Sequence, residues 1–290
     1  MTSVDVEIIR AFVDGAEGGN PAGFVLDGDA FTPDQRQRIA AALGLSETAF
    51  VTASPAADVA LVFHTPTKAI PHCGHATVAA FSRLWELGRL TGKEATNATV
   101  DGVRRLFRED GAVFMEQVAP ALRPLPASGE ATPAAVLAAL GLGAGDLLPG
   151  FAPVLAHNGN GLLLVPLKAA SSLPRLAPDL DAIARISEAE RLIGFYVFAP
   201  TPEGPRDAEV RMFAPAFGIP EEAATGMMAG PLGWWLHHVL GRRETAFVIS
   251  QGRFMDPPSP SLLHVVLEGA GLKVGGQARL VERRTVRIEG

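Results

Sequence analysis

The chain has 290 residues, 48% of them hydrophobic and 19% charged, which is typical of a globular protein and excludes a disordered one. This length allows about two domains, each with its own core. The formal net charge of −6 comes without a basic stretch, which argues against nucleic acid and membrane surfaces as partners. Residues 1–12 lack the pattern of an export signal, and Cys73 is the single cysteine, so we expect a cytoplasmic protein.

In the first half, turn residues separate short apolar runs that predict strands, with two helical segments between them. We expect strands over residues 4–12, 24–26, 45–51 and 59–65, helices over 32–44 and 77–87, and a hairpin over 104–117. Thr32 is a good helix cap, Pro33 suits a first helical position, and Gly44 ends the helix. Asp110-Gly111 is a favourable turn pair for the hairpin.

The best candidate for a linker is Pro120–Pro126 with the Ser/Gly/Thr-rich stretch behind it. A capped helix then starts at Thr132. We expect a further helix over 180–186 and strands within 158–167, 193–199, 247–250, 262–267, 272–274 and 281–288, with Gly275-Gly276 opening a turn. Strands outnumber helices without regular alternation, so we predict an α+β fold in which each half wraps a curved, mostly antiparallel sheet around a central helix.

A strand–loop–helix pattern occurs twice, over residues 61–88 and 210–241. Aligning Pro66 with Pro215 gives an offset of 215 − 66 = 149, and both copies run from an apolar strand through a Pro-bounded turn into an apolar helix. Such a repeat predicts two similar domains, which we place at 1–118 and 119–278, with a last strand at about 279–290 that can return to the first domain. Two facing helix N-termini would hold an anion such as a carboxylate.

The Cys73-Gly74-His75 turn is the richest local cluster. At a helix start, the dipole would favour a thiolate and a neutral imidazole. The alternative is a buried small thiol beside a histidine that only caps the helix. A metal site of His72, Cys73, His75 and His237 or His238 is a weaker hypothesis, because the spacing matches no usual zinc pattern and no carboxylate cluster accompanies it. We therefore expect no metal.

Two acidic positions are further candidates. Glu47 lies at the mouth of an apolar strand, where it could act as a general base near neutral pH or serve only as a capping or edge carboxylate. Glu222 follows Glu221 just before the second helix start, where carboxylates are expected in any case to favour the dipole. Since no Gly-rich phosphate loop occurs, we expect no nucleotide and no other cofactor.

Strings spread over nearly the whole chain resemble, in order, those of the PhzF-like (phenazine biosynthesis-like) family, whose fold is similar to diaminopimelate epimerase. They are Gly19-Asn20-Pro21-Ala22, residues 46–51 (SETAFV), 73–77 (CGHAT), 211–215 (RMFAP), 224–226 (ATG), 229–232 (AGPL), 250–252 (SQG) and 274–276 (VGG). The resemblance implies two similar domains, an active site in the cleft between them and a homodimer. It also implies cofactor-free proton transfer at carbon, with Glu47 as acid/base, His75 assisting and Glu222 opposite.

The chain departs from the family at two positions: Glu222 stands where aspartate is usual, and Met227 where serine is usual. An extra methylene moves the carboxylate by roughly 1.5 Å, and Met227 removes a hydroxyl donor, so we expect an altered substrate or a reduced activity. Cys73 stands where the epimerases carry one of two catalytic cysteines. The offset of 149 places Glu222 opposite it, which argues against a two-thiol racemase.

The sequence thus predicts an isomerase or epimerase that moves a C–H proton on a small carboxylate-bearing metabolite. The predicted catalytic residues are Glu47, His75 and Glu222, and the predicted substrate-binding residues are Asn20, Cys73, Gly74, Ala76, Thr77, Thr225, Gly226 and Met227. The alternative is a non-catalytic family member that binds a metabolite or a protein partner. Met227 favours that alternative, whereas Glu47 with His75 favours catalysis.

Overall fold

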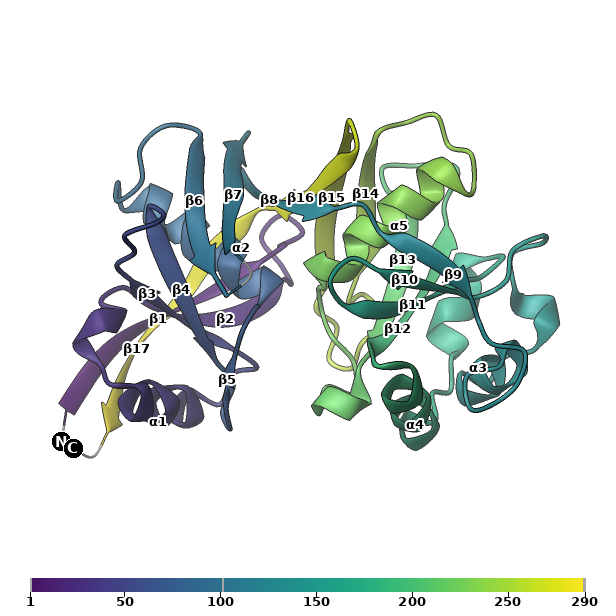
Figure 1. Ribbon diagram of the computed structural model, residues 1–290, viewed down its shortest axis with the longest axis horizontal. Coiled ribbons are helices and arrows are strands. Elements are labelled where there is room, and N and C mark those ends of the chain that lie inside the picture. The colour runs from purple at the N-terminus through teal and green to yellow at the C-terminus, as the bar shows by residue number, and fades with distance from the viewer. Residues whose placement is uncertain (1, 101, 289–290) are drawn as a thin grey trace. The chain divides into compact units, whose positions relative to one another are not determined.

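The computed structural model describes residues 2–100 and 102–288. The chain forms two compact units: residues 1–116 with 275–290 make unit 1, and residues 117–274 make unit 2. Each unit is α+β with mostly antiparallel strands around a long helix, as expected (Figure 1). The domain boundaries expected at 118 and 278 stay a prediction. Among the described residues, no helix combines the length and apolar character needed to cross a membrane.

Unit 1 begins and ends with paired strands, because β1 and β17 run antiparallel from Thr2 opposite Ile288 to Ala11 opposite Ala278. Its strands are β1 (Thr2–Ala11), β2 (Asn20–Val25), β3 (Thr48–Thr52), β4 (Val59–His64), β5 (Ala69–Ile70), β6 (Glu94–Thr99), β7 (Gly102–Glu109), β8 (Ala112–Val118) and β17 (Ala278–Ile288). Two neighbouring pairs are parallel, β2 with β3 and β4 with β6. Parallel strands need a crossover, and α1 (Pro33–Leu43) and α2 (Gly74–Glu86) supply it.

Unit 2 repeats this topology. Its strands are β9 (Ala121–Pro124), β10 (Val154–His157), β11 (Gly161–Pro166), β12 (Leu192–Pro200), β13 (Ala208–Phe213), β14 (Ala246–Gln251), β15 (Ser261–Glu268) and β16 (Gly271–Gly276), and its α-helices are α3 (Pro133–Ala139), α4 (Leu180–Glu190) and α5 (Gly226–His238). The parallel pairs are β11 with β12 and β13 with β14, and α4 and α5 bridge them. α4 therefore matches α1, and α5 matches α2.

The helices follow from local signals and from burial. Thr32 and Gln35 form a capping box at the start of α1, and Gly44 ends it with a φ of 66°, as the sequence predicts. The central helices α2 and α5 are buried around most of their circumference, which suits their apolar sequences. On unit 1, α1 packs Ile39 and Leu43 against a cluster that includes Val4 and Val286 from the terminal strands.

Four details of the sequence interpretation are wrong. Pro120–Pro126 is not an irregular linker, because Ala121–Pro124 forms β9 and pairs with β10. Gly275-Gly276 opens no turn and continues β16. The first central helix begins at Gly74 rather than residue 77. A strand at Glu94–Thr99, β6, was not expected, because its polar sequence lacks an apolar alternation.

The repeat offset also changes within the motif. From β4 to β13 it is 208 − 59 = 149, as expected, but from α2 to α5 it is 226 − 74 = 152. The turn before α5 is thus three residues longer than the turn before α2. The residue that matches Cys73 at the helix cap is therefore Thr225, and the expected match with Glu222 is wrong.

Candidate active site

Three buried side chains predicted from the sequence meet at the start of α2 in unit 1. Glu47 Oε2 lies 3.3 Å from His75 Nε2, and Cys73 Sγ lies 3.5 Å from His75 Nδ1. The exposed fractions are 8% for Glu47, 7% for Cys73 and 4% for His75. The imidazole thus has a carboxylate at one nitrogen and a thiol at the other, shielded from bulk water.

Short-range interactions hold the backbone of this cluster. Gly44 ends α1, so the chain turns and presents Glu47 directly before β3. The Gly23 N–H on β2 donates to the Glu47 carbonyl oxygen at 3.0 Å. At the start of α2, the Thr77 hydroxyl donates to the Cys73 carbonyl oxygen at 2.6 Å. Both ends of the cluster are therefore fixed by backbone contacts that do not involve the reactive side-chain atoms.

The arrangement suits proton transfer. Within the described residues, Glu47 Oε2 has no hydrogen-bond partner and meets His75 only as an ion-pair contact. A buried carboxylate oxygen left in this way calls for a functional explanation. A carboxylate beside an imidazole can exchange a proton with a bound substrate, and the first-turn amides of α2 point their partial positive charge at the same place.

In unit 2, the predicted residues Glu222 and Thr225 lie just before α5 and contact each other. The Thr225 hydroxyl donates to Glu222 Oε2 at 2.7 Å. Buried Gln251 donates to the Glu222 carbonyl at 2.7 Å and to Thr225 Oγ1 at 3.1 Å. Its Oε1 accepts from the Thr225 N–H at 3.2 Å and from the Tyr196 hydroxyl at 3.0 Å. Burial first, and the Glu222 carboxylate second, raise the pKa of Tyr196 well above its usual value, so this hydroxyl keeps its proton.

Side chains also hold the first turn of α5. Pro231 has no N–H, so the Met227 carbonyl lacks its usual partner four residues on, and Asn158 Nδ2 donates to it at 3.3 Å. Gln117 Nε2 donates to the Gly226 carbonyl at 3.0 Å. The Met227 sulfur lies 2.8 Å from Asn160 Nδ2, so a polar side chain of the β10–β11 turn meets the thioether.

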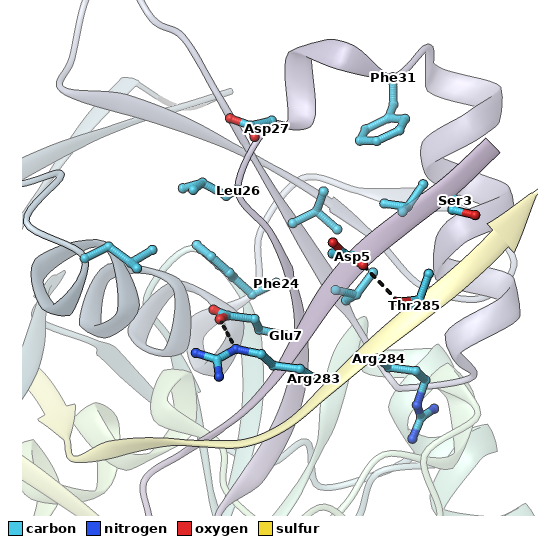
Figure 2. A pocket seen from close by; sticks show the side chains of 14 residues that line it. Ser3, Asp5, Glu7, Phe24, Leu26, Asp27, Phe31, Arg283, Arg284 and Thr285 are labelled. Carbon is cyan, nitrogen blue, oxygen red and sulfur yellow. Dashed lines mark hydrogen bonds and ion pairs between the residues drawn. The ribbon is translucent and has the colours of Figure 1, made fainter.

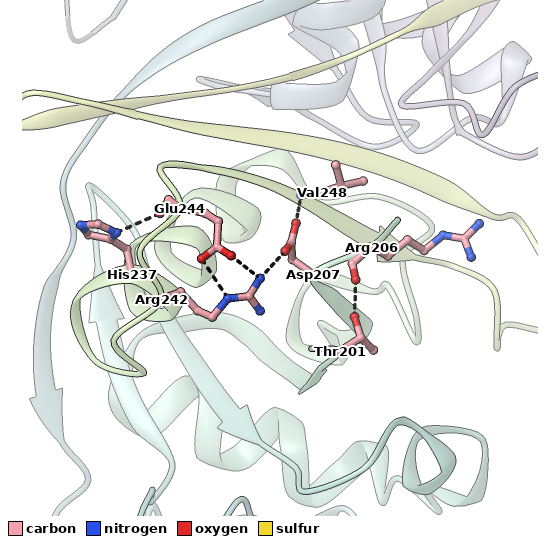
Figure 3. A network of polar contacts seen from close by, with 7 residues as sticks. All are labelled: Thr201, Arg206, Asp207, His237, Arg242, Glu244 and Val248. Carbon is pink, nitrogen blue, oxygen red and sulfur yellow. Dashed lines mark hydrogen bonds and ion pairs between the residues drawn. The ribbon is translucent and has the colours of Figure 1, made fainter. Parts of the chain in front are cut away.

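The structure places the remaining predicted residues as follows. Asn20 is buried at the start of β2, and Ala76 is buried in the first turn of α2. Gly74 is the first residue of α2. His237 and His238 lie in the last turn of α5, where His237 Nδ1 is 2.9 Å from the Glu244 carbonyl oxygen (Figure 3).

The hypothesis of a metal site needs a correction. A carboxylate does accompany Cys73 and His75, because Glu47 reaches them: one ligand atom of each of the three lies within 4.8 Å of the others. Among the described residues, the histidine, cysteine and acidic side chains whose ligand atoms come this close together in a group of three are Glu47, Cys73 and His75. Glu47 is 26 residues before Cys73 (73 − 47 = 26), so no short spacing rule could have found the group.

A separate pocket lies elsewhere, on β1, β2 and β17 of unit 1 (Figure 2). Its volume is about 630 Å³, and none of the predicted site residues lines it. Two of its charged groups bind each other, because Arg283 Nε donates to Glu7 Oε1 at 3.1 Å. A third, Asp5, accepts from the Thr285 hydroxyl at 2.9 Å. We therefore place the chemistry at Glu47 and not in this pocket.

Sequence reasoning missed the residues that support α5. Gln251 stands in the SQG string but received no role, and Gln117 and Asn158 were treated as strand and turn residues. One signal was available: Pro231 inside an apolar helix predicts an unpaired carbonyl at Met227 that another side chain must satisfy.

The two α+β units have an epimerase-like fold. A solved structure described as a predicted epimerase from Pseudomonas aeruginosa matches with a TM-score of 0.77 and 23% identity over 99% of this chain and 100% of that one, and one described as a probable proline racemase from Agrobacterium radiobacter matches with a TM-score of 0.63 and 12% identity over 99% of this chain and 93% of that one. A sequence profile of the phenazine biosynthesis-like proteins matches residues 9–284. The chain is 39% identical over 234 residues to the uncharacterized isomerase YddE of Escherichia coli O157:H7, covering 79% of this chain and 78% of the relative.

Two further comparisons agree. The trans-2,3-dihydro-3-hydroxyanthranilate isomerase of Pseudomonas aeruginosa is 31% identical over 278 residues, covering 92% of this chain and 91% of that protein. The crystal structure of the Bacillus anthracis phenazine biosynthesis protein of the PhzF family matches with a TM-score of 0.87 and 26% identity over 99% of this chain and 100% of that one. The chain belongs to the phenazine biosynthesis-like family, whose named relatives are isomerases.

Proposed function

We propose that the chain is a cofactor-independent isomerase that moves a C–H proton on a small carboxylate-bearing metabolite. Glu47 removes the proton and returns it at a second position, and His75 shares the charge. The observation that carries the proposal is the buried contact of 3.3 Å between Glu47 Oε2 and His75 Nε2. The amides at the start of α2 supply the partial positive charge that a substrate carboxylate or an enolate-like anion needs.

The proposal assigns the proton transfer to these groups. A base must reach the C–H bond, and the anion that forms must be stabilised until the proton returns. A positioned base contributes about 10²–10⁴-fold to such a reaction, and hydrogen-bond donors aimed at the developing charge contribute more. The role expected for Glu222, the interdomain cleft, the homodimer and the cytoplasmic location stay predictions.

The test is incorporation of deuterium from D₂O into candidate substrates, read by mass spectrometry. The panel contains trans-2,3-dihydro-3-hydroxyanthranilate, which the Pseudomonas relative isomerises by its name, and cyclic and open-chain 2-amino acids. Acids that co-purify with the protein join the panel. We expect exchange with at least one of them.

The decisive variant is Glu47→Gln, which keeps the shape of the side chain but cannot accept the proton. We expect exchange to fall by at least about 10²-fold while ligand binding persists. Glu86→Gln, at the last residue of α2 and away from Glu47, His75 and Cys73, is the control and should keep the wild-type rate. Undiminished exchange in Glu47→Gln would remove Glu47 from the mechanism, and a wild-type protein without exchange on any bound acid would favour the non-catalytic alternative.

A further inference from the structure

We propose that Glu47, Cys73 and His75 form a binding site for a thiophilic divalent cation, with Zn²⁺ as the natural candidate, and that the bound ion switches off proton transfer. The site goes beyond the proposed isomerase activity, because binding of the ion can be measured without turnover.

The donor set is the first reason. Thiolate sulfur, imidazole nitrogen and carboxylate oxygen are the three ligand types that zinc binds in proteins, and three protein ligands leave one coordination position open. A thiolate and a carboxylate bring two negative charges to meet the two positive charges of the ion. Cys73 is the cap residue of α2, and the thiolate is the form of cysteine that binds a metal.

Geometry is the second reason. In a tetrahedral site with bonds of roughly 2.0–2.3 Å, ligand atoms lie about 3.3–3.7 Å apart. The distance of 3.3 Å between Glu47 Oε2 and His75 Nε2 matches this spacing, and one ligand atom of each residue lies within 4.8 Å of the others. The 3.5 Å contact of Cys73 Sγ is made to the other ring nitrogen, Nδ1, so it is not a second ligand–ligand distance of the same ion. Side-chain rotations that shift atoms by about 1 Å would bring all three to one ion.

Burial and backbone support are the third reason. All three residues are less than a tenth exposed, so bulk water competes poorly for the ion. The hydrogen bonds of Gly23 and Thr77 to the Glu47 and Cys73 carbonyls fix the backbone without using any ligand atom. The ion would therefore meet a partly prepared site and not a flexible surface.

Binding has a defined proton balance and a defined effect. When the thiol is protonated, the Cys73 S–H bond breaks, a sulfur–metal bond forms, and one proton passes to solvent for each ion bound. The bound ion occupies the carboxylate oxygen and the imidazole nitrogen that the proposed proton transfer needs. Zinc should therefore inhibit in competition with substrate, and a chelator should restore activity.

The experiment uses the full-length protein, reduced with a phosphine that does not bind the metal. Co²⁺ is titrated as a spectroscopic probe, because a cobalt–thiolate bond gives a charge-transfer absorption in the near ultraviolet that reports Cys73 directly. Zn²⁺ binding is measured by calorimetry and by displacement of Co²⁺. We expect one ion per chain, a cobalt–thiolate band in the wild type, and loss of that band in Cys73→Ala.

Each ligand variant, Cys73→Ala, Glu47→Gln and His75→Gln, should weaken Zn²⁺ binding by more than about tenfold, since even the loss of an outer-shell partner weakens metal sites by about 10–100-fold. His72→Gln, beside Cys73 but outside the group, and His237→Gln, on α5, are matched controls that should bind as the wild type does. Circular dichroism checks folding, and Cys73→Ser and Glu47→Asp replace any variant that fails it.

Two results would overturn the proposal: no saturable binding of Co²⁺ or Zn²⁺ by the wild type, or binding that the three ligand variants leave unchanged. Both readouts are independent of turnover. A failure here would leave the isomerase proposal intact, and a failure of deuterium exchange without metal would leave the metal site intact.

Discussion

Replacing Gln251 by leucine removes a side chain that uses all of its hydrogen-bonding capacity. Oε1 accepts from the Tyr196 hydroxyl and the Thr225 N–H, and Nε2 donates to the Glu222 carbonyl and to Thr225 Oγ1. Leucine has a similar volume, so the change acts mainly on these bonds. Thr225 Oγ1 keeps Glu222 Oε2 as a partner, so the Tyr196 hydroxyl and the Thr225 N–H are the buried groups that lose theirs.

Each buried polar group left without a partner costs about 1–3 kcal/mol. Two such groups, the Tyr196 hydroxyl and the Thr225 N–H, correspond to a loss of about 2–6 kcal/mol in the free energy of unfolding, and we expect about 3 kcal/mol. Tyr196→Phe removes one donor without stranding another group, since Oε1 keeps the Thr225 N–H. It should cost only about 1 kcal/mol.

Urea unfolding followed by tryptophan fluorescence measures these changes, because Trp234 and Trp235 lie on α5. The double variant is decisive: once Gln251 is gone, removing the Tyr196 hydroxyl relieves a buried donor. Gln251→Leu with Tyr196→Phe should therefore be no less stable than Gln251→Leu alone, giving a coupling of about 1–2 kcal/mol. Strict additivity of the two single changes would refute the shared-network reasoning.

Three further changes test other parts of the fold. Gly230→Ala places a Cβ against Gln117 Oε1 and should cost about 1–3 kcal/mol in urea unfolding, whereas an unchanged midpoint would mean that Gln117 moves away easily. Burial lowers the pKa of His64, so neutral His64 contributes its full share to the free energy of unfolding above about pH 6.5, and this share is lost as the pH falls through the lowered pKa. His64→Gln should therefore make the free energy of unfolding depend less on pH between pH 7.5 and 5.5. An equal pH dependence in the wild type and the variant would contradict this. Glu7→Gln removes the negative charge and one of the two oxygens that accept from Arg83 at 2.6 and 2.8 Å, so it should cost about 2 kcal/mol in urea unfolding. An unchanged urea midpoint would contradict this expectation.

The parts of the fold that follow local rules could be predicted from the sequence. The capping signals at Thr32 and Gly44 predicted the ends of α1. The repeated apolar pattern, offset by 149 residues, identified β4 and β13 as equivalent strands. The pairing of Glu47 with His75 came from the family resemblance, and the structure brings the two side chains together. No pattern within the sequence itself predicted that Glu47 and His75, 28 residues apart (75 − 47 = 28), would be in contact.

The rest depends on features that no local pattern carries. The extra three residues before α5 shift the helix equivalence from Glu222 to Thr225, because a turn can lengthen without changing the apolar periodicity on either side. Gln251 supports α5 from 25 residues beyond its first residue (251 − 226 = 25), at the end of a strand. β9 was missed because Pro120 and Pro124 suggested a linker, and an edge position tolerates proline.

Pro231 in α5 makes the position of the helix's first turn independent of the side chain at residue 227. Because Gln117 and Asn158 bind the carbonyl oxygens of Gly226 and Met227, the position of this first turn depends on backbone atoms that every residue type possesses. The side chain at position 227 can therefore be exchanged over evolution while the anchor points of the turn persist. Because no side-chain atom of residue 227 takes part in these two hydrogen bonds, a substitution such as Met227→Ser leaves both anchors of the first turn in place.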